Sequence, residues 1–416
     1  MIQPQDTRHQ APPTSQQPQT PGKGPRKVST QVKVVGALAL IIFLVAAGFL
    51  FMENGNNPSN PTVNPTANSN VVTPVLSKPW CASPNELVND FYGTSMSSLS
   101  TSDVWSAGSQ IRHWDGKSWN TSYTPASQQS VLRGILEVAA NDVWVVGEQQ
   151  TNGMASHPLV LHWDGSNWKN VSAPDISTGG KNALVALSGT GSDNLWAVGF
   201  SVPLQGPMVP LIEHWNGSKW SVSHLSTSVS LQFTSVKALT ANNVWAVGYE
   251  YGTRDGKNFV QPVTEHWNGS QWSSVTNPDL RAKGGGNLYS ISGDSADDLW
   301  AVGSQNNGSA MLTEHWNGSK WSIVTSPAVA PGNSNWLASV AVSSPNNVWA
   351  VGRVASSQGG FDPFVLHWDG QQWQVLSDPT SNAGELDIVS FVGSQVWIVG
   401  LPKTSGGHAF IETLCP

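Results

Sequence analysis

One short string recurs seven times along the chain and limits its possible folds more than any other feature. Its copies are DVWSAG, DVWVVG, NLWAVG, NVWAVG, DLWAVG, NVWAVG and QVWIVG, with tryptophans at Trp105, Trp144, Trp196, Trp245, Trp300, Trp349 and Trp397. A second string, of the form HWDGxxW or HWNGxxW, follows each of the first six copies. Self-similarity at a period of about 50 residues indicates a repeat architecture rather than a series of unrelated domains.

Each repeat predicts four short antiparallel strands. VWAVG is typical of an inner strand covered on both faces, and a polar turn and another apolar strand, such as FTSVKALT, precede it. Asp-Gly or Asn-Gly in the second string predicts a two-residue type I′ hairpin. With Asn216 and Gly217 as that loop, we expect Trp215 opposite Ser218. Trp215 and Trp220 would then form a diagonal pair on the inward face.

A four-stranded unit cannot bury both of its faces alone, so the units must stack on one another. We therefore expect an all-β fold over residues 75–416, a seven-bladed β-propeller of four-stranded antiparallel blades, preceded by one transmembrane helix. A β-solenoid has shorter coils than these repeats, and seven separate domains would need linkers that the sequence lacks.

The two ends of the repeat region are expected to complete one blade together. The seventh unit stops without a fourth strand, and residues 74–84 (PVLSKPWCASP) supply a candidate through Trp80. This pairing puts Cys81 and Cys415 on adjacent strands and predicts a disulfide between them, with a stabilisation of about 5–6 kcal/mol in the chain-entropy model. The alternative is two free buried thiols.

The N-terminal part predicts a membrane anchor. Residues 33–52 end in nineteen uncharged residues, about 28 Å of helix, and the basic residues lie on the N-terminal side. Residues 1–32 predict a disordered cytoplasmic tail, and residues 53–74 a Pro/Asn-rich stalk. We expect a single-pass protein of the cell membrane with an extracellular propeller. The alternative is a cleaved signal peptide.

The charge of the repeat region argues against nucleic acid as a partner. The chain has 27 acidic and 20 basic residues, of which one acid and five bases lie in the first 33, leaving 26 acids and 15 bases beyond them. A nucleic-acid surface needs the opposite sign.

The period, the strand ending in Gly and the Trp after a tight aromatic-Asp turn resemble the kelch repeats of galactose-oxidase-type propellers. Kelch units carry a Gly-Gly doublet and a Tyr-Asp pair, whereas a single Gly and His-Trp-Asp/Asn stand here. NVWAVG is also similar to tectonin-type repeats, and HWDGSNW to the Asp-box hairpin of sialidase-type propellers. These resemblances imply a propeller fold, and they do not carry a function with them.

Repeated polar residues are predicted to serve the architecture. Six histidines occur once per blade, on strands too far apart to hold one metal ion, so no metal and no cofactor is expected. They are His113, His162, His214, His266, His315 and His367. The acid or amide before each VW or LW pair is expected to close its own turn, with cation binding as the alternative. Glu213, Glu265 and Glu314 repeat in the same way.

No catalytic constellation is recognisable, so we expect a protein that is not an enzyme. There is no GxSxG, HExxH or Gly-rich phosphate loop, and the arginines of the repeat region stand at unrelated unit positions. The main hypothesis is an extracellular binding module for protein or glycan. The alternatives are a cell-surface polysaccharide hydrolase or lyase with a site in the propeller funnel, and a structural adhesion scaffold.

The loops between second and third strands differ most in length and are where recognition usually resides. They predict a ligand surface formed by Tyr249, Tyr251, Arg254, Asp255, Arg353, Phe361 and Asp362. The alternative is that these loops are solvated and have no partner.

Overall fold

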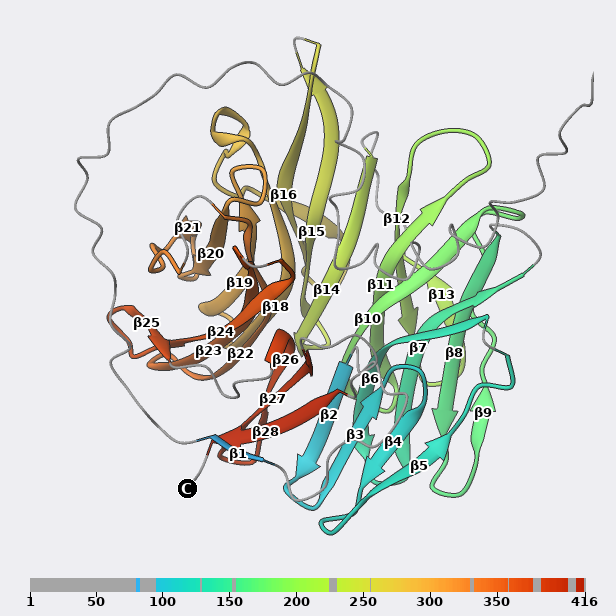
Figure 1. Cartoon of the computed structure of the whole chain (residues 1–416). Coiled ribbons are helices and arrows are strands. Elements are labelled where there is room, and N and C mark those ends of the chain that lie inside the picture. Colours follow the sequence, from blue (N-terminus) through green and yellow to red (C-terminus); the bar gives the residue numbers. More distant parts are fainter. Residues whose placement is uncertain are drawn as a thin grey trace, which may run out of the picture. The chain divides into compact units, whose positions relative to one another are not determined.

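A computed structural model describes residues 80–82, 95–127, 129–151, 155–223, 230–254, 256–329, 333–357, 359–376, 383–402 and 409–414 (Figure 1). The predicted tail (1–32), transmembrane helix (33–52) and stalk (53–74) lie outside these residues. Within the described ranges no helix has the length and apolar character to cross a bilayer. The described residues are β-strands and loops, with a single turn of 3-10 helix, η1 (Arg281–Lys283).

The strands fall into units of four antiparallel strands, as the repeats predict. The first strands are β2 (Ser95–Ser100), β6 (Ser130–Ala139), β10 (Lys181–Gly191), β14 (Ser230–Thr240), β18 (Gly286–Ser295), β22 (Asn335–Ser344) and β26 (Ala383–Val392). The second strands are β3 (Asp103–Ala107), β7 (Asp142–Gln150), β11 (Asn194–Val202), β15 (Asn243–Arg254), β19 (Asp298–Gln305), β23 (Asn347–Ala355) and β27 (Gln395–Pro402).

The third strands carry the histidines, and the fourth strands begin at the second Trp of the hairpin. The third strands are β4 (Ile111–Trp114), β8 (Ser156–Trp163), β12 (Val209–Trp215), β16 (Lys257–Trp267), β20 (Ala310–Trp316), β24 (Phe361–Trp368) and β28 (Phe410–Leu414). The fourth strands are β5 (Trp119–Tyr123), β9 (Trp168–Asn170), β13 (Trp220–Val222), β17 (Trp272–Val275), β21 (Trp321–Ile323), β25 (Trp373–Leu376) and β1 (Trp80–Ala82). A single parallel bridge, Lys181 to Ser156, joins β10 to β8 and so links the second and third units into one sheet.

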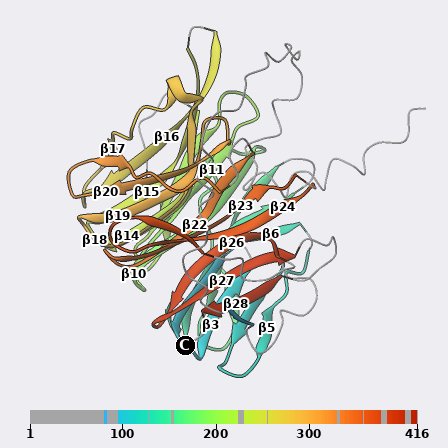
Figure 2. The same ribbon diagram turned by 60° about the vertical axis from the view of Figure 1, so that its left-hand side comes forward.

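Each unit packs its face against the next one. First strands contact one another in chain order from β2 to β26, and β26 contacts β2, so the first and last units are neighbours (Figures 1 and 2). The described residues form seven hydrophobic clusters, of which six are shared by two consecutive units and one by the first and last units. In one of them Trp300 of β19 lies against Trp368 and Trp373 of the following unit, with ring centroids 5.0 and 5.1 Å apart. Burial of these tryptophans is what holds neighbouring sheets together.

The chain ends meet in the last unit. Strand β1 lies beside β28 and completes that sheet (Figure 1), with Trp80 opposite Leu414 and Cys81 opposite Thr413. Trp80 also packs edge-on against Trp349 of the preceding unit at 6.2 Å. The predicted strand pairing is therefore present. Cys415 lies outside the described residues, and the Cys81–Cys415 bond stays a prediction.

The hairpin register differs from the sequence prediction. Trp215 lies directly opposite Trp220 rather than Ser218, because Asn216 to Lys219 form a four-residue loop. The side-chain oxygen of Asn216 accepts hydrogen bonds from the backbone N–H groups of Ser218 and Lys219, both at 3.1 Å. Gly217 alone takes positive φ, 86°, whereas a type I′ turn needs it at two positions.

A β-bulge interrupts six of the first strands, β6, β10, β14, β18, β22 and β26, opposite the glycine of the VG pair. In β18 the pairing shifts between Leu288 and Ser290, so Tyr289 has no partner in β19. The glycine is required there, because a Cβ on Gly303 would lie 1.9 Å from the backbone oxygen of Asn287. In β26 the same shift isolates Asp387. Bulges re-aim side chains at the ends of strands.

Serine hydroxyls cover the edges of the first strands. The backbone N–H groups of Val340 and Val342 donate to the hydroxyls of Ser290 and Ser292 of the preceding unit, both at 3.2 Å. Val389 donates in the same way to Ser339. An unpaired strand edge is otherwise open to other chains, so these bonds help to keep the units in one molecule.

Candidate functional site

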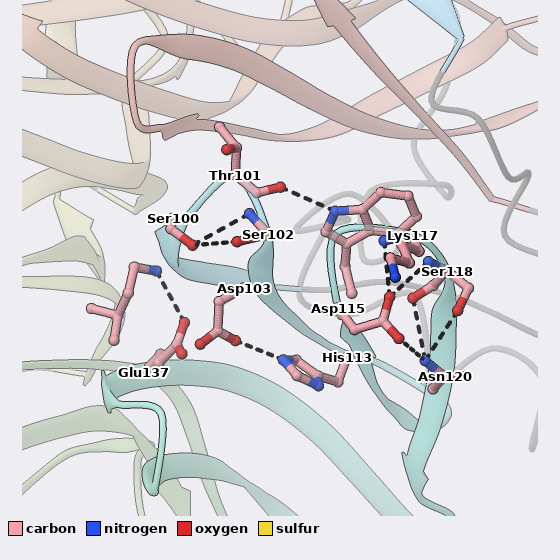
Figure 3. A network of polar contacts seen from close by, with 12 residues as sticks. Ser100, Thr101, Ser102, Asp103, His113, Asp115, Lys117, Ser118, Asn120 and Glu137 are labelled. Carbon is pink, nitrogen blue, oxygen red and sulfur yellow. Dashed lines mark hydrogen bonds and ion pairs between the residues drawn. The ribbon is translucent and has the colours of Figure 1, made fainter.

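In six units the repeated histidine and the Asx residue before VW or LW join two strands of the sheet. They lie at the turn end of the strands, which is the end that carries the Asp-Gly or Asn-Gly hairpin loop. In all six units His Nε2 lies 2.6 to 3.0 Å from the side-chain oxygen of the Asp or Asn before VW or LW. Figure 3 shows this contact for His113 and Asp103. The histidine ring also lies on the inner Trp, at 4.2 Å for His113 on Trp105. The Asx oxygen therefore binds a histidine, and closing its own turn is not its main role.

The residues of the predicted ligand surface lie at the opposite end of the strands. Tyr249 and Tyr251 are on β15, Arg353 is on β23, and Phe361 and Asp362 begin β24. Arg254 ends β15, although its side chain is not among those described, and Asp255 lies outside the described residues. The sequence prediction did not say how far these residues converge.

The tyrosines form one half of the cluster. Tyr249 is only 2% exposed, and its hydroxyl accepts a hydrogen bond from Gln232 Nε2. Its ring lies edge-on to Tyr251 at 5.3 Å and to Tyr289 at 6.3 Å. Burial raises the pKa of both Tyr249 and Tyr251, so both hydroxyls remain protonated at neutral pH. Tyr251 remains 37% exposed and offers an open aromatic face.

Arg353 forms the other half. Its guanidinium carbon lies 4.5 Å from the ring centroid of Trp336 and 4.9 Å from that of Phe361. The guanidinium also pairs with the carboxylate of Glu385 in the next unit. Arg353 is 2% exposed, so it is a supporting cation rather than a group that a partner could reach.

One bulge residue belongs to each half, and the sequence analysis did not find either one: Tyr289 lies beside Tyr249, and Asp387 follows Glu385 on β26. Tyr289 accepts a hydrogen bond from Asn287 Nδ2 at 2.9 Å and interacts electrostatically with Tyr251 and Arg353. Asp387 faces Arg353, and burial raises the pKa of its carboxyl although Arg353 acts to lower it. We call Tyr249, Tyr251, Tyr289, Arg353 and Asp387 the rim cluster. Burial also lowers the pKa of Arg353, against the opposing effect of Asp387.

A second charged group lies at the same end of the second and third units. Arg133 is a bulge residue and pairs with Glu148 at 2.5 Å, and Lys181 lies 3.4 Å from the same carboxylate. Burial alone would raise the pKa of Glu148, but Arg133 and Lys181 outweigh it and the pKa is lowered. Ser156 donates a further hydrogen bond at 3.0 Å. The charged side chains of this group are paired with one another and largely buried, which favours a structural role.

Comparisons with known proteins bear on the fold alone. No family model matches the chain, and no curated protein matches it. Among solved structures, "YCF48 bound to D1 peptide" is 15% identical with a TM-score of 0.54, covering 83% of this chain and 100% of that one. The WD40 β-propeller domain of Doa1 is 10% identical with a TM-score of 0.50, covering 80% and 97%. A streptogramin B lyase is 13% identical with a TM-score of 0.50, covering 79% and 96%.

The fold is a β-propeller. At these identities the likeness shows architecture and does not transfer function. It supports the propeller expected from the repeats and does not single out the kelch type.

Proposed function

We propose that the protein is a binding module whose contact surface is the rim cluster, and that its ligand is a protein. The observation that carries this proposal is that four successive units carry aromatic and charged side chains at the same end of the sheets. Interaction hot spots are rich in Tyr, Trp and Arg side chains. This surface likewise presents aromatic rings around a buried ion pair. YCF48, similar in fold, was solved with a peptide, which is consistent with this use of a propeller.

The proposal includes the architecture that presents this surface. Seven repeats, seven shared hydrophobic clusters and the contact of β2 with β26 support a seven-bladed ring, and the kelch type is proposed on the resemblance of the repeats alone. The pairing of β1 with β28 supports its closure by a Cys81–Cys415 disulfide, and Cys81 is not a free thiol. The uncharged run within residues 33–52 supports a single-pass anchor with the propeller outside the cell.

A glycan ligand and a polysaccharide hydrolase or lyase have less support. A glycosidase of the usual kind needs two free carboxyls about 5–10 Å apart. Glu385, beside the rim cluster, is already paired with Arg353, so Asp387 has no second free carboxyl among the groups described around it.

The test is a screen of the full chain, in detergent, against arrays of surface proteins and glycans. Each ligand found is then measured with Tyr251→Ala and Phe361→Ala. Removal of an aromatic contact is expected to weaken binding of a protein ligand by about 2 kcal/mol. Asp193→Asn, an exposed residue at the turn end of the strands, is the matched control. Equal binding by all variants and the wild type would refute the rim cluster as the contact surface.

A further inference from the structure

One buried carboxyl, that of Glu137, has no counterpart in the other units. Glu137 lies on β6, opposite the first residue of the VW pair of its own unit. The residues at the same position in the other six units are not ionisable: Ser98, Gly189, Ala238, Gly293, Val342 and Phe391. Because those units form the same four-stranded sheet without an acid, the architecture of the repeat does not account for Glu137.

Glu137 joins the second unit to the first. Its side chain is 4% exposed, and its Oε2 accepts a hydrogen bond from the backbone N–H of Leu99 on β2 at 3.0 Å. Its own backbone N–H donates to the hydroxyl of Ser97, also on β2, at 2.9 Å. The residue therefore binds the edge of β2 through both its backbone and its side chain.

The carboxyl of Glu137 also faces the carboxyl of Asp103 on β3. Figure 3 shows the two groups turned toward each other, and a side-chain hydrogen bond joins them. Asp103 Oδ1 lies 2.6 Å from His113 Nε2. A hydrogen bond between two carboxyls requires a proton on one of them. Glu137 Oε1 is buried and has no hydrogen-bond donor among the described residues, so a proton on this oxygen gives it the partner it lacks.

The electrostatic surroundings of Glu137 agree with a shared proton. Burial, the charge of Asp103 and the hydrogen bond between the two carboxyls raise the pKa of Glu137 to about 8, against the opposing effects of Leu99 and Trp105. Among the described groups, Asp103 is the ionisable one that acts on Glu137, and His113 on β4 in turn binds Asp103. Strands β7 and β10 also pack against β6 and contribute no charged group to these effects.

We propose that Glu137 and Asp103 form a pH-sensitive contact between the first and second units. While the pair shares a proton, Glu137 donates to Asp103 and β6 stays against β2 and β3. Opening of the contact releases this proton to solvent, which Asp103 reaches because its side chain is 23% exposed. With both carboxyls ionised, like charges would face each other with little water between them, so the contact weakens as pH rises.

Two variants hold the contact without a proton to lose. In Glu137→Gln the amide nitrogen can donate to Asp103 while its oxygen accepts from Leu99. In Asp103→Asn the amide can donate to Glu137 and still accept from His113. The other units already pair an amide with the histidine in this way, at Asn194, Asn243 and Asn347.

Asp142→Asn is the matched control. Asp142 lies 2.8 Å from His162 Nε2, as Asp103 does from its own histidine, but the residue that corresponds to Glu137 in the following unit is Gly189. This variant therefore changes the same kind of histidine contact where no second carboxyl occupies the position of Glu137.

The measurement is amide hydrogen exchange of the full chain in detergent, read by peptide mass spectrometry between pH 5 and 9 and corrected for the intrinsic rate at each pH. The closed contact binds the proton with a pKa of about 8, and an open one has the ordinary value of 4.5. Protection of β2 in the wild type should therefore fall by up to about tenfold per pH unit until about pH 8 and then level off. Glu137→Gln and Asp103→Asn should remove this fall, and Asp142→Asn should keep it. Protection of β22, in the sixth unit, should not differ among the variants.

The same pH dependence in the wild type and Glu137→Gln would overturn the inference. So would its loss in Asp142→Asn, because the histidine contact rather than the carboxyl pair would then be responsible. Infrared difference spectra at pH 7 give a second readout: each of the two variants should lack one protonated carboxyl that the wild type has. An unchanged band of protonated carboxyls would contradict the shared proton, and thermal unfolding shows that each variant is folded under the conditions compared.

Discussion

The buried carboxyl of Glu213 gives a quantitative test of how the sheets pack. Glu213 lies on β12, opposite Ala197 and Val222, and is 0% exposed. Neither of its carboxyl oxygens has a hydrogen-bond partner within the described residues. Burial, with a contribution from Asp175, raises its pKa to about 8. Glu213→Gln keeps the shape of the side chain and removes the ionisation.

The sign of the effect follows from where the proton is bound. The carboxyl has a pKa of about 8 in the folded state and 4.5 as its ordinary value, so the folded state binds the proton more tightly. The wild type therefore loses stability as pH rises above 4.5, and the loss ends as pH passes through about 8. The slope is about 1.4 kcal/mol per pH unit, which accumulates to a maximum of about 5 kcal/mol.

The assay is urea unfolding of the wild type and Glu213→Gln at several pH values between 4 and 9. The free-energy difference between them should be constant near pH 4 and should shift in favour of the variant as pH rises. A constant offset from the new amide does not affect this slope. Leu204→Ala, at an exposed side chain that does not ionise, is the control. A difference in unfolding free energy that does not change with pH would contradict the burial of the Glu213 carboxyl.

Two further predictions concern the packing of the units. Trp300→Ala removes a buried ring between two sheets and should lower the free energy of unfolding by about 3–5 kcal/mol. The control, Leu204→Ala, changes a side chain that is 77% exposed and should alter the free energy of unfolding by less than about 0.5 kcal/mol. Similar values for the two would contradict the interface. Gly303→Ala should lower the free energy of unfolding by at least about 3 kcal/mol in the same urea assay, because the new Cβ would meet the backbone oxygen of Asn287. Gly191→Ala should leave it nearly unchanged, because the nearest atom to that Cβ, Asp193 Oδ1, is 3.5 Å away. Tolerance of Gly303→Ala would show that the bulge is misplaced.

The repeat pattern was sufficient to predict the strands, their grouping and the meeting of the chain ends. This succeeded because Trp105 and its six equivalents mark the same position in every unit, and because Trp80 supplies the strand that the last unit lacks. The hairpin register was predicted wrongly. Asn-Gly alone suggests a two-residue loop, and the side chain of Asn216 stabilises a longer one through bonds that no pairing rule includes.

The candidate site was predicted only in part. Tyr251 and Phe361 were found because they stand in or beside the long loops. Tyr289 and Asp387 were missed because they occupy bulges inside the apolar strands predicted before the VWAVG strands, where the residue type changes from unit to unit. The burial of Arg353 was also missed, since its aromatic neighbours come together only after the sheets have stacked.

The contact between the first and last units tests the closed ring most directly. A Cβ on Gly393 would lie 3.6 Å from Thr101 Cγ2, although the two turns are far apart in sequence. A Thr101→Cys, Ser394→Cys double variant should therefore be joined within one chain by a short bis-maleimide, as detected by peptide mass spectrometry. Ser102→Cys with Lys117→Cys, in two loops that touch within the first unit, is the positive control. Efficient cross-linking of both pairs in monomeric protein is the predicted result. Cross-linking of the control pair alone would contradict a ring in which the first and last units are neighbours.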